Sequence, residues 1–211
     1  MPKGKITYCI IDETDPSEEF ECEGKVIEQF FKTSPLFEPS NCISRIQKNV
    51  DVENFIRSRT TGVFHIFHLA AHGAYYRKGK GRLDYSVILS RRGKEEREIF
   101  RHDTIVRSGL EADVFVSTCC QSFNDAFLDT LEHYEKVWNF IAPAREPLIG
   151  ETILFSLLFY NDLLRNTKLS ASWVKDDTVK RSFLKARKAF LAYGGTGDFR
   201  LYVQAENREY P

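Results

Sequence analysis

The chain has 211 residues, of which 42% are hydrophobic and 28% are charged, as in ordinary soluble globular proteins. Its 30 Lys and Arg residues balance 30 Asp and Glu residues, and this zero formal net charge argues against bulk electrostatic binding to nucleic acid or to an acidic membrane. Five cysteines without regular spacing, and no apolar run long enough for a signal peptide or a membrane span, lead us to expect a cytoplasmic protein with free thiols.

Strand-like and helix-like segments alternate along the chain. Short apolar runs predict strands, in chain order, at Ile6–Asp12, Cys42–Ile46, Val63–Ala70, Ser86–Ser90, Arg97–Phe100, Asp113–Thr118, Val137–Ala142 and Arg200–Gln204. Caps and helical spacing predict helices at Ser17–Phe31, Asp51–Arg59, Asp103–Ser108, Ala126–Lys136, Gly150–Leu164 and Thr178–Tyr193. We expect the fourth and fifth strands to form an exposed hairpin, and the last strand to lie on an edge.

This alternation predicts a single α/β domain over residues 1–211. Parallel strands that are buried on both faces read as continuous apolar runs, as they do here. We therefore expect a mostly parallel central sheet of five or six strands with helices on both faces. In such sheets, reactive side chains and ligands gather beyond the carboxyl ends of the strands.

Two of the apolar runs end in residues that can carry out chemistry. One stops at His72 and Gly73, and the other stops at Cys119 and Cys120; the His and the first Cys are 119 − 72 = 47 residues apart. Caspase-type proteases place the catalytic His about 50 residues upstream of the Cys. An imidazole can take the proton of a thiol and later give it to a leaving amine. If the two strands are parallel neighbours, His72 and Cys119 share one cleft, where the amides of Gly73 and Cys119 are candidate oxyanion donors.

The residues around these two strand ends resemble the CHAT family within the caspase-like (clan CD) cysteine proteases. The resemblance rests on Phe67–Gly73 and Val116–Cys119, with further support from Pro147–Glu151 and Phe155–Tyr160, and it spans roughly residues 63 to 193. It implies a caspase-hemoglobinase three-layer sandwich and cleavage of peptide bonds by a Cys-His dyad that uses no cofactor.

The same resemblance assigns roles to single residues: His72 is the general base and Cys119 is the nucleophile. Many relatives hold a basic substrate residue with an acidic group, for which Asp125 and Glu151 are the candidates here. The chain departs from the family pattern at Thr118, where Ala is usual, and in the residues directly after the nucleophile.

Cys120 is the rival nucleophile. Alternation along a strand sends Cys119 and Cys120 to opposite sides, so only one of them can face the cleft. The family register favours Cys119 for that place, with Cys120 packed inward. The structural alternative is that Cys119 is simply a small buried hydrophobic residue at a strand end.

Three other features of the sequence give less support to a functional interpretation. His65, His68 and His72 have no nearby carboxylate and no HExxH pattern, so we expect no metal site and interpret the first two as packing or hydrogen-bonded residues. The basic cluster Arg77–Arg82 is interpreted as a flexible loop beside the substrate groove rather than a nucleic-acid contact. Gly194–Gly197 lacks the Lys-Ser/Thr of a phosphate loop and is expected to end a helix.

The sequence thus predicts a cysteine endopeptidase that cleaves a protein substrate. We expect a regulatory partner on another chain to gate it, and no direct contact with a membrane or with nucleic acid. Family resemblance places it in a bacterial defence or cell-death system. The alternative is a catalytically inactive caspase-like interaction module, which the departures after Cys119 favour. A nucleotide-binding domain is discounted because Asp12–Pro16, after the first strand, is acidic.

Overall fold

The computed structural model describes residues 6–12, 23–37, 64–78, 82–89, 98–107, 109–134, 136–167 and 174–211. The predicted elements at Cys42–Ile46 and Asp51–Arg59, and the predicted helix cap Ser17, lie outside these residues. The statements below concern the described part of the chain.

A six-stranded mixed sheet forms the centre of the molecule. Its strands are β1 (Tyr8–Asp12), β2 (Phe64–Ala70), β6 (Ala112–Ser117), β7 (Val137–Pro143), β8 (Phe199–Val203) and β9 (Arg208–Tyr210). They lie in the order β1-β2-β6-β7-β8-β9; the first four are parallel, and β8 and β9 are antiparallel to their neighbours. The mostly parallel sheet is as predicted. The expectation that the last strand lies on an edge is wrong for β8, because the chain turns through the 3-10 helix η1 (Gln204–Glu206) and adds β9 outside it.

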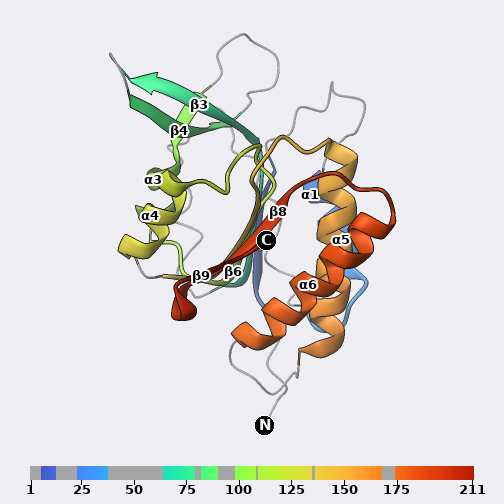
Figure 1. Ribbon diagram of the computed structural model, residues 1–211. Coiled ribbons are helices and arrows are strands. Elements are labelled where there is room, and N and C mark those ends of the chain that lie inside the picture. The colour runs from blue at the N-terminus through green and yellow to red at the C-terminus, as the bar shows by residue number, and fades with distance from the viewer. Residues whose placement is uncertain are drawn as a thin grey trace.

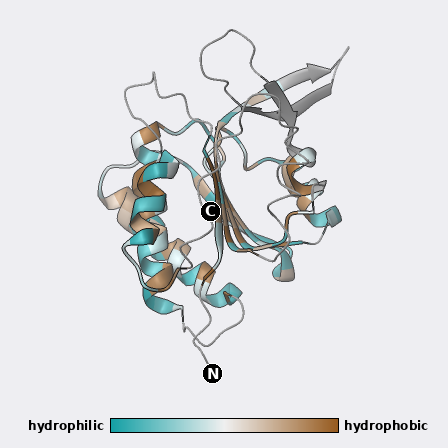
Figure 2. Ribbon diagram, turned by 180° about the vertical axis from the view of Figure 1, so that it is seen from behind, coloured by the Kyte–Doolittle hydropathy of each residue, from teal (hydrophilic) through white to brown (hydrophobic). Residues whose placement is uncertain are grey.

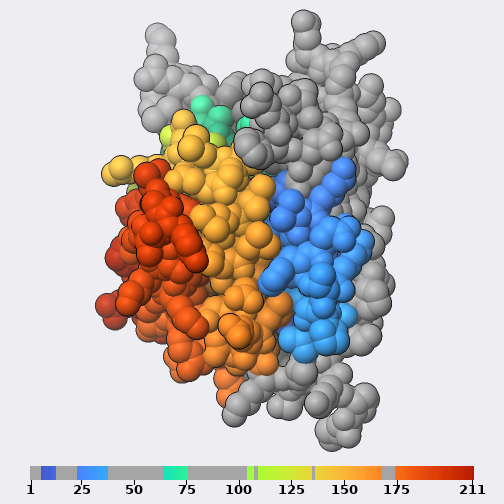
Figure 3. All heavy atoms as spheres, turned by 90° about the vertical axis from the view of Figure 1, so that its right-hand side faces the viewer, coloured from blue at the N-terminus to red at the C-terminus, as the bar shows by residue number. Residues whose placement is uncertain are grey.

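Helices cover both faces of this sheet, so the molecule has three layers (Figure 1). One face carries α1 (Glu23–Lys32), α5 (Ile149–Asn166) and α6 (Asp176–Ala192), and the other carries α3 (His102–Arg107) and α4 (Asp125–Tyr134). Figure 2 shows the sheet nearly edge-on between the two helical layers. In Figure 3, α5 lies between α1 and α6 and contacts both.

Alternation along the strands builds two separate cores. On β6, Val114 and Val116 enter the core under α1, α5 and α6, whereas Phe115 enters the core under α3 and α4. Aromatic packing fills both: the rings of Phe155 and Phe199 stack at 4.0 Å on the first face, and Phe115 meets Phe140 edge-on at 5.2 Å on the second. Each such buried side chain stabilises the fold by roughly 2–3 kcal/mol, so burial on both faces explains the continuous apolar runs.

A second, three-stranded antiparallel sheet leaves the central sheet where β2 ends. It consists of β3 (His72–Lys78), β4 (Arg82–Leu89) and β5 (Glu98–Arg101), and it extends beyond the central sheet at the top of Figure 1. The predicted hairpin is confirmed as the pairing of β4 with β5. The interpretation of the basic cluster as a loop is wrong at its ends, because Arg77 pairs with Leu83 and Lys78 pairs with Arg82 in the β3–β4 ladder; residues 79–81 are outside the described part.

The remaining helix predictions are confirmed to within a few residues. The helix α3 ends before Gly109, whose φ of +90° favours a residue without a side chain, and Gly194 with a φ of +83° follows α6 in the same way. Across the described residues, every helix is too short or too polar to span a bilayer.

Candidate active site

His72 and Cys119 follow two adjacent parallel strands at the same edge of the central sheet. Leu69 of β2 lies opposite Ser117 of β6, and the Thr118 amide donates to the Leu69 carbonyl at 2.9 Å, extending this register by one step. His72 comes three residues after Leu69, and Cys119 comes two after Ser117. The expectation that the two strands are parallel neighbours is therefore confirmed.

The Cys119 thiol is fully buried, in the core under α3 and α4 together with Ala71 and Phe123. Burial raises the pKa of this thiol to about 12. Hydrogen bonds with Ser117 and with the backbone of Ala71, the residue before His72, lower the pKa less than burial raises it. In this conformation the thiol is protonated at neutral pH and lies behind the strand ends rather than at the surface.

The exposures of the two cysteines are the reverse of those predicted. Cys120 is partly exposed and Cys119 is buried, so the expectation that Cys119 faces the cleft while Cys120 packs inward is wrong for this conformation. The reason is strand alternation continued past the end of β6: Phe115 and Cys119 lie in the core under α3 and α4, while Thr118 turns to the opposite face.

Side-chain and backbone hydrogen bonds hold the turn that carries the two cysteines. The Ser122 hydroxyl donates to the Cys119 carbonyl at 2.8 Å, and the Ser117 hydroxyl donates to Ser122 at 2.9 Å. Gln121 takes a positive φ of 55°, and its amide donates to the Arg145 carbonyl at 3.2 Å, which ties the turn to the segment after β7. The turn is thus built from specific contacts and not from apolar packing alone.

The two predicted oxyanion donors have different environments. The Cys119 amide already donates to the Ser117 hydroxyl, at 3.4 Å, and must exchange this partner before it can bind an oxyanion. Gly73 is partly buried, next to His72 at the start of β3 and opposite Val87 of β4.

The two acidic candidates also differ. Asp125 is exposed at the first turn of α4, and its negative charge contributes, after burial, to the raised pKa of Tyr75 on β3. This places Asp125 beside the strand that His72 begins.

Glu151 is engaged within the protein. Although partial burial opposes it, hydrogen bonds from the backbone of Thr196 and Leu148 lower the pKa of Glu151. Its carboxylate accepts from the Thr196 hydroxyl at 2.9 Å and from the Leu148 amide at 3.1 Å, which caps α5 and holds the segment before β8. The structure therefore gives Glu151 a structural task and leaves Asp125 as the acidic residue beside the strand ends.

Sequence reasoning missed a buried polar cluster directly behind the cysteine turn. Its members come from three elements, α1, β2 and α5, and from the end of β6, and we call them the Glu23 cluster: Glu23, His68, Thr118, Thr152 and Tyr160. His68 was expected to be a packing or hydrogen-bonded residue, and its Nδ1 does lie 2.8 Å from the Tyr160 hydroxyl. Nothing in the sequence pattern singled out Glu23, because an acidic residue in an amphipathic helix is usually a solvated one.

The other histidines have ordinary roles. The ring nitrogen Nδ1 of His65 lies 2.8 Å from the Thr7 hydroxyl, which confirms the predicted hydrogen-bonding role, and His133 is exposed on α4. Among the residues that the structure describes, no three His, Cys, Asp or Glu side chains gather as metal ligands.

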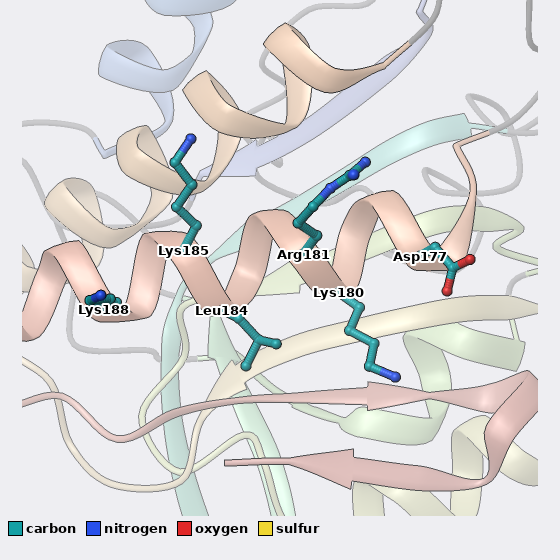
Figure 4. Close-up of a pocket in the computed structure, with 6 residues that line it drawn as sticks. All are labelled: Asp177, Lys180, Arg181, Leu184, Lys185 and Lys188. Atoms are coloured by element: carbon teal, nitrogen blue, oxygen red, sulfur yellow. The ribbon is translucent and has the colours of Figure 1, made fainter.

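A shallow hollow on α6 lies far along the chain from these residues. Figure 4 shows its six lining side chains, with Lys185 and Arg181 pointing to one side of the helix and Lys180 and Leu184 to the other. Lys180 is 3.3 Å from Glu206, and Lys185 is paired with Asp162. These nearby acids offset much of the positive charge of the hollow. These features describe a solvated helix face rather than a binding site.

Comparison of the sequence with protein-family models and with curated proteins finds no match.

Proposed function

We propose that this chain is a cysteine endopeptidase of the CHAT type, in which His72 and Cys119 form a catalytic dyad. The observation that carries the proposal is the pairing of β2 with β6, since it brings the carboxyl ends of the His strand and the Cys strand together. The sandwich of a mostly parallel sheet between two helical layers, with a small antiparallel sheet after the His strand, agrees with the caspase-hemoglobinase fold implied by the sequence resemblance.

The proposed reaction proceeds through an acyl-enzyme. His72 takes the thiol proton, and Cys119 Sγ forms a bond to the scissile carbonyl carbon. The amide of Gly73 donates to the developing oxyanion, a contact worth roughly 3–4 kcal/mol when well placed. His72 then protonates the leaving amine, and water, activated by the same imidazole, hydrolyses the thioester and restores the thiol.

The burial of Cys119 supports gating by a regulatory partner. A fully buried thiol with a pKa of about 12 is a poor nucleophile, so the described conformation corresponds to a resting form. In our proposal, a protein partner on another chain shifts the cysteine turn toward His72 and the solvent. A bacterial defence or cell-death role, as the resemblance implies, fits an enzyme kept inactive until it is triggered.

Asp125 supports a basic residue as the preferred residue at the cleavage position. It is exposed and lies beside β3. A carboxylate there attracts a substrate Arg or Lys by charge and hydrogen bonding.

The deciding experiment is to map new protein N-termini after the wild-type chain is co-expressed with the products of its neighbouring genes. Cys119→Ala is the test variant, and Cys120→Ala, which changes the adjacent thiol, is its matched control. The proposal expects cleavage products that disappear in Cys119→Ala and persist in Cys120→Ala. Products that persist in Cys119→Ala would refute the assignment of the nucleophile.

A catalytically inactive interaction module is the second candidate. It is favoured by the buried Cys119 thiol and by the Cys119 amide, which is already bonded to Ser117. An acyloxymethyl-ketone probe separates the two functions. Labelling of Cys119 that is lost in His72→Ala supports the protease, and absence of labelling with every tested partner supports the module.

A further inference from the structure

A carboxylate is buried directly behind the turn that carries Cys119. Glu23 is only 2% exposed and opens α1, where the Gly24 amide donates to the Asp12 side chain at 3.0 Å and fixes the start of the helix against the end of β1. A buried carboxylate is costly unless hydrogen bonds and a cation compensate it. The contacts of Glu23 therefore indicate what it holds in place.

The two carboxylate oxygens of Glu23 contact different residues. Oε2 accepts hydrogen bonds from the hydroxyls of Thr118, at 3.0 Å, and Thr152, at 2.8 Å. Oε1 lies 3.3 Å from His68 Nε2, and both side chains are almost completely buried. His68 in turn is hydrogen-bonded to Tyr160. One carboxylate thus joins α1, β2, α5 and the residue that precedes Cys119.

Thr118 is the contact that links this cluster to the thiol. It is adjacent to Cys119, it leaves β6 toward the opposite face, and its amide is bonded to Leu69 of β2. It is also a position at which the chain departs from the family pattern, which has Ala there. Its hydroxyl can therefore fix the orientation of the turn in a way that an alanine cannot.

We propose that Glu23 is a positioning residue for Cys119, acting through the Thr118 hydroxyl. This inference rests on the proposed function for its catalytic consequence, but the positioning itself is a property of the fold. Glu23 holds Thr118 on one side of the sheet, and the alternation of the chain then places the Cys119 side chain on the other. Loss of the hydrogen bond frees the turn, so that the buried thiol reaches solvent more often.

The charge of Glu23 also acts on the thiol. Burial raises the pKa of Cys119 most, and Cys120 in the same turn and Glu23 from α1 also raise it. Burial, and then the charge of Glu23, raise the pKa of Tyr160 well above its ordinary value of 10. Removal of this negative charge lowers the pKa of Cys119.

The chain offers a matched pair of variants for the test. Thr118→Val and Thr152→Val each remove one hydrogen bond to the same oxygen of Glu23, and each hydroxyl has one backbone carbonyl nearby, at Leu69 or at Ile149. Only Thr118 is adjacent to Cys119. The rate of alkylation of each cysteine by iodoacetamide, measured by peptide mass spectrometry from about pH 7 to about pH 11, reports thiol access and ionisation.

We expect Thr118→Val to raise the alkylation rate of Cys119 about tenfold and Thr152→Val to change it less than about twofold. Glu23→Gln is expected to raise the alkylation rate of Cys119 across this pH range, because removal of the negative charge lowers the pKa of the thiol. Asp113→Asn, which removes a buried carboxylate at the other end of β6, should leave the rate unchanged. Equal effects of the two Thr variants, or no effect of Thr118→Val, would overturn the proposal.

The outcomes separate positioning from protease function. If the wild-type chain cleaves a substrate, Thr118→Val should raise its cleavage in the absence of the regulatory partner roughly tenfold while Thr152→Val stays near wild type, because the freed turn exposes the nucleophile more often. If the wild-type chain cleaves nothing even when it is co-expressed with the products of its neighbouring genes, the proposed function falls, and the alkylation rates still decide the positioning. If Glu23→Gln does not fold, the two Thr variants decide it alone.

Discussion

The carboxylate of Asp113 accepts a hydrogen bond of 2.8 Å from the amide of Val174, at the end of the central sheet opposite the cysteine turn. Asp113 is almost completely buried, and burial raises its pKa from 3.8 to about 6, with the neighbouring Asp176 adding to the effect and the Val174 hydrogen bond opposing it. The sheet therefore has a buried carboxylate near each end, Asp113 at one and Glu23 at the other.

Asp113 makes the stability of the fold depend on pH. Because its folded pKa lies above its unfolded value, the folded state binds more protons, and the contribution of Asp113 to stability is full below about pH 4 and is lost as the pH rises through about 6. The loss is at most about 3 kcal/mol. Asp113→Asn, which keeps an acceptor for Val174, should flatten the dependence of Tm on pH in this range. An unchanged pH profile in thermal unfolding would contradict this expectation.

Gly24 is required by the close approach of α1 to β1. A Cβ atom at this position would lie 2.5 Å from Cβ of Asp12, which is closer than real side-chain contacts. Gly24→Ala should therefore destabilise the fold by about 1–3 kcal/mol, measured by urea unfolding. Gly150→Ala is the control, because nothing lies within 4 Å of that added Cβ in the first turn of α5, and it should be neutral or stabilising. A similar loss of stability in both variants would refute the packing argument.

Cys120 should react before Cys119 in the folded protein. Cys120 is partly exposed and Cys119 is buried with a raised pKa, so brief alkylation near pH 8 should label Cys120 at least tenfold faster. The comparison is made by peptide mass spectrometry, with the urea-unfolded chain as the reference in which the two rates converge. Faster labelling of Cys119 in the native protein would show that its thiol is exposed in solution.

Asp125 should govern the choice of substrate residue if the protease proposal holds. Asp125→Asn should lower kcat/KM for a peptide with Arg at the cleavage position by about tenfold or more, with little change for a peptide with Leu. The same variant should lower the pKa of Tyr75, to which the Asp125 charge contributes after burial. Ultraviolet titration of the tyrosines tests this second effect without any activity, and no change there would place Asp125 away from β3.

Phe155 should be among the residues most important for stability. It is fully buried, stacks on Phe199 at 4.0 Å and meets Phe183 and Phe190 edge-on. Phe155→Ala should cost about 3–5 kcal/mol in chemical unfolding, whereas Leu148→Ala, at a side chain that is 72% exposed, should stay within about 0.5 kcal/mol. Comparable losses in the two variants would contradict the described core.

The alternation of apolar runs and helical periods by itself determined most of the described architecture. Strands such as Val137–Pro143 and helices such as Ile149–Asn166 were predictable because burial on both faces of a parallel sheet demands continuous apolar residues, and because helices show their spacing locally. The positions of His72 and Cys119 after strand ends followed from the same pattern, whereas the pairing of β2 with β6 came only from the structure. The pattern did not predict that the pairing of β3 with β4 extends to Arg77 and Arg82, or that the strand β9 is added. Short polar strands carry little signal in the sequence.

Only the tertiary structure decided which side of the sheet each residue after a strand end occupies. The sequence allowed either Cys119 or Cys120 to face outward. The choice depends on contacts of Cys119 with Ser117 and Phe123 in the same part of the chain and with Ala71, which follows β2. The same holds for the partners of Glu23, which lie 95 residues away at Thr118 and 129 residues away at Thr152. In the sequence, a buried carboxylate looks like any other acidic residue of a helix, because only long-range packing removes its water. Sequence periodicity therefore located the edge of the sheet but not the cluster that holds its cysteine turn.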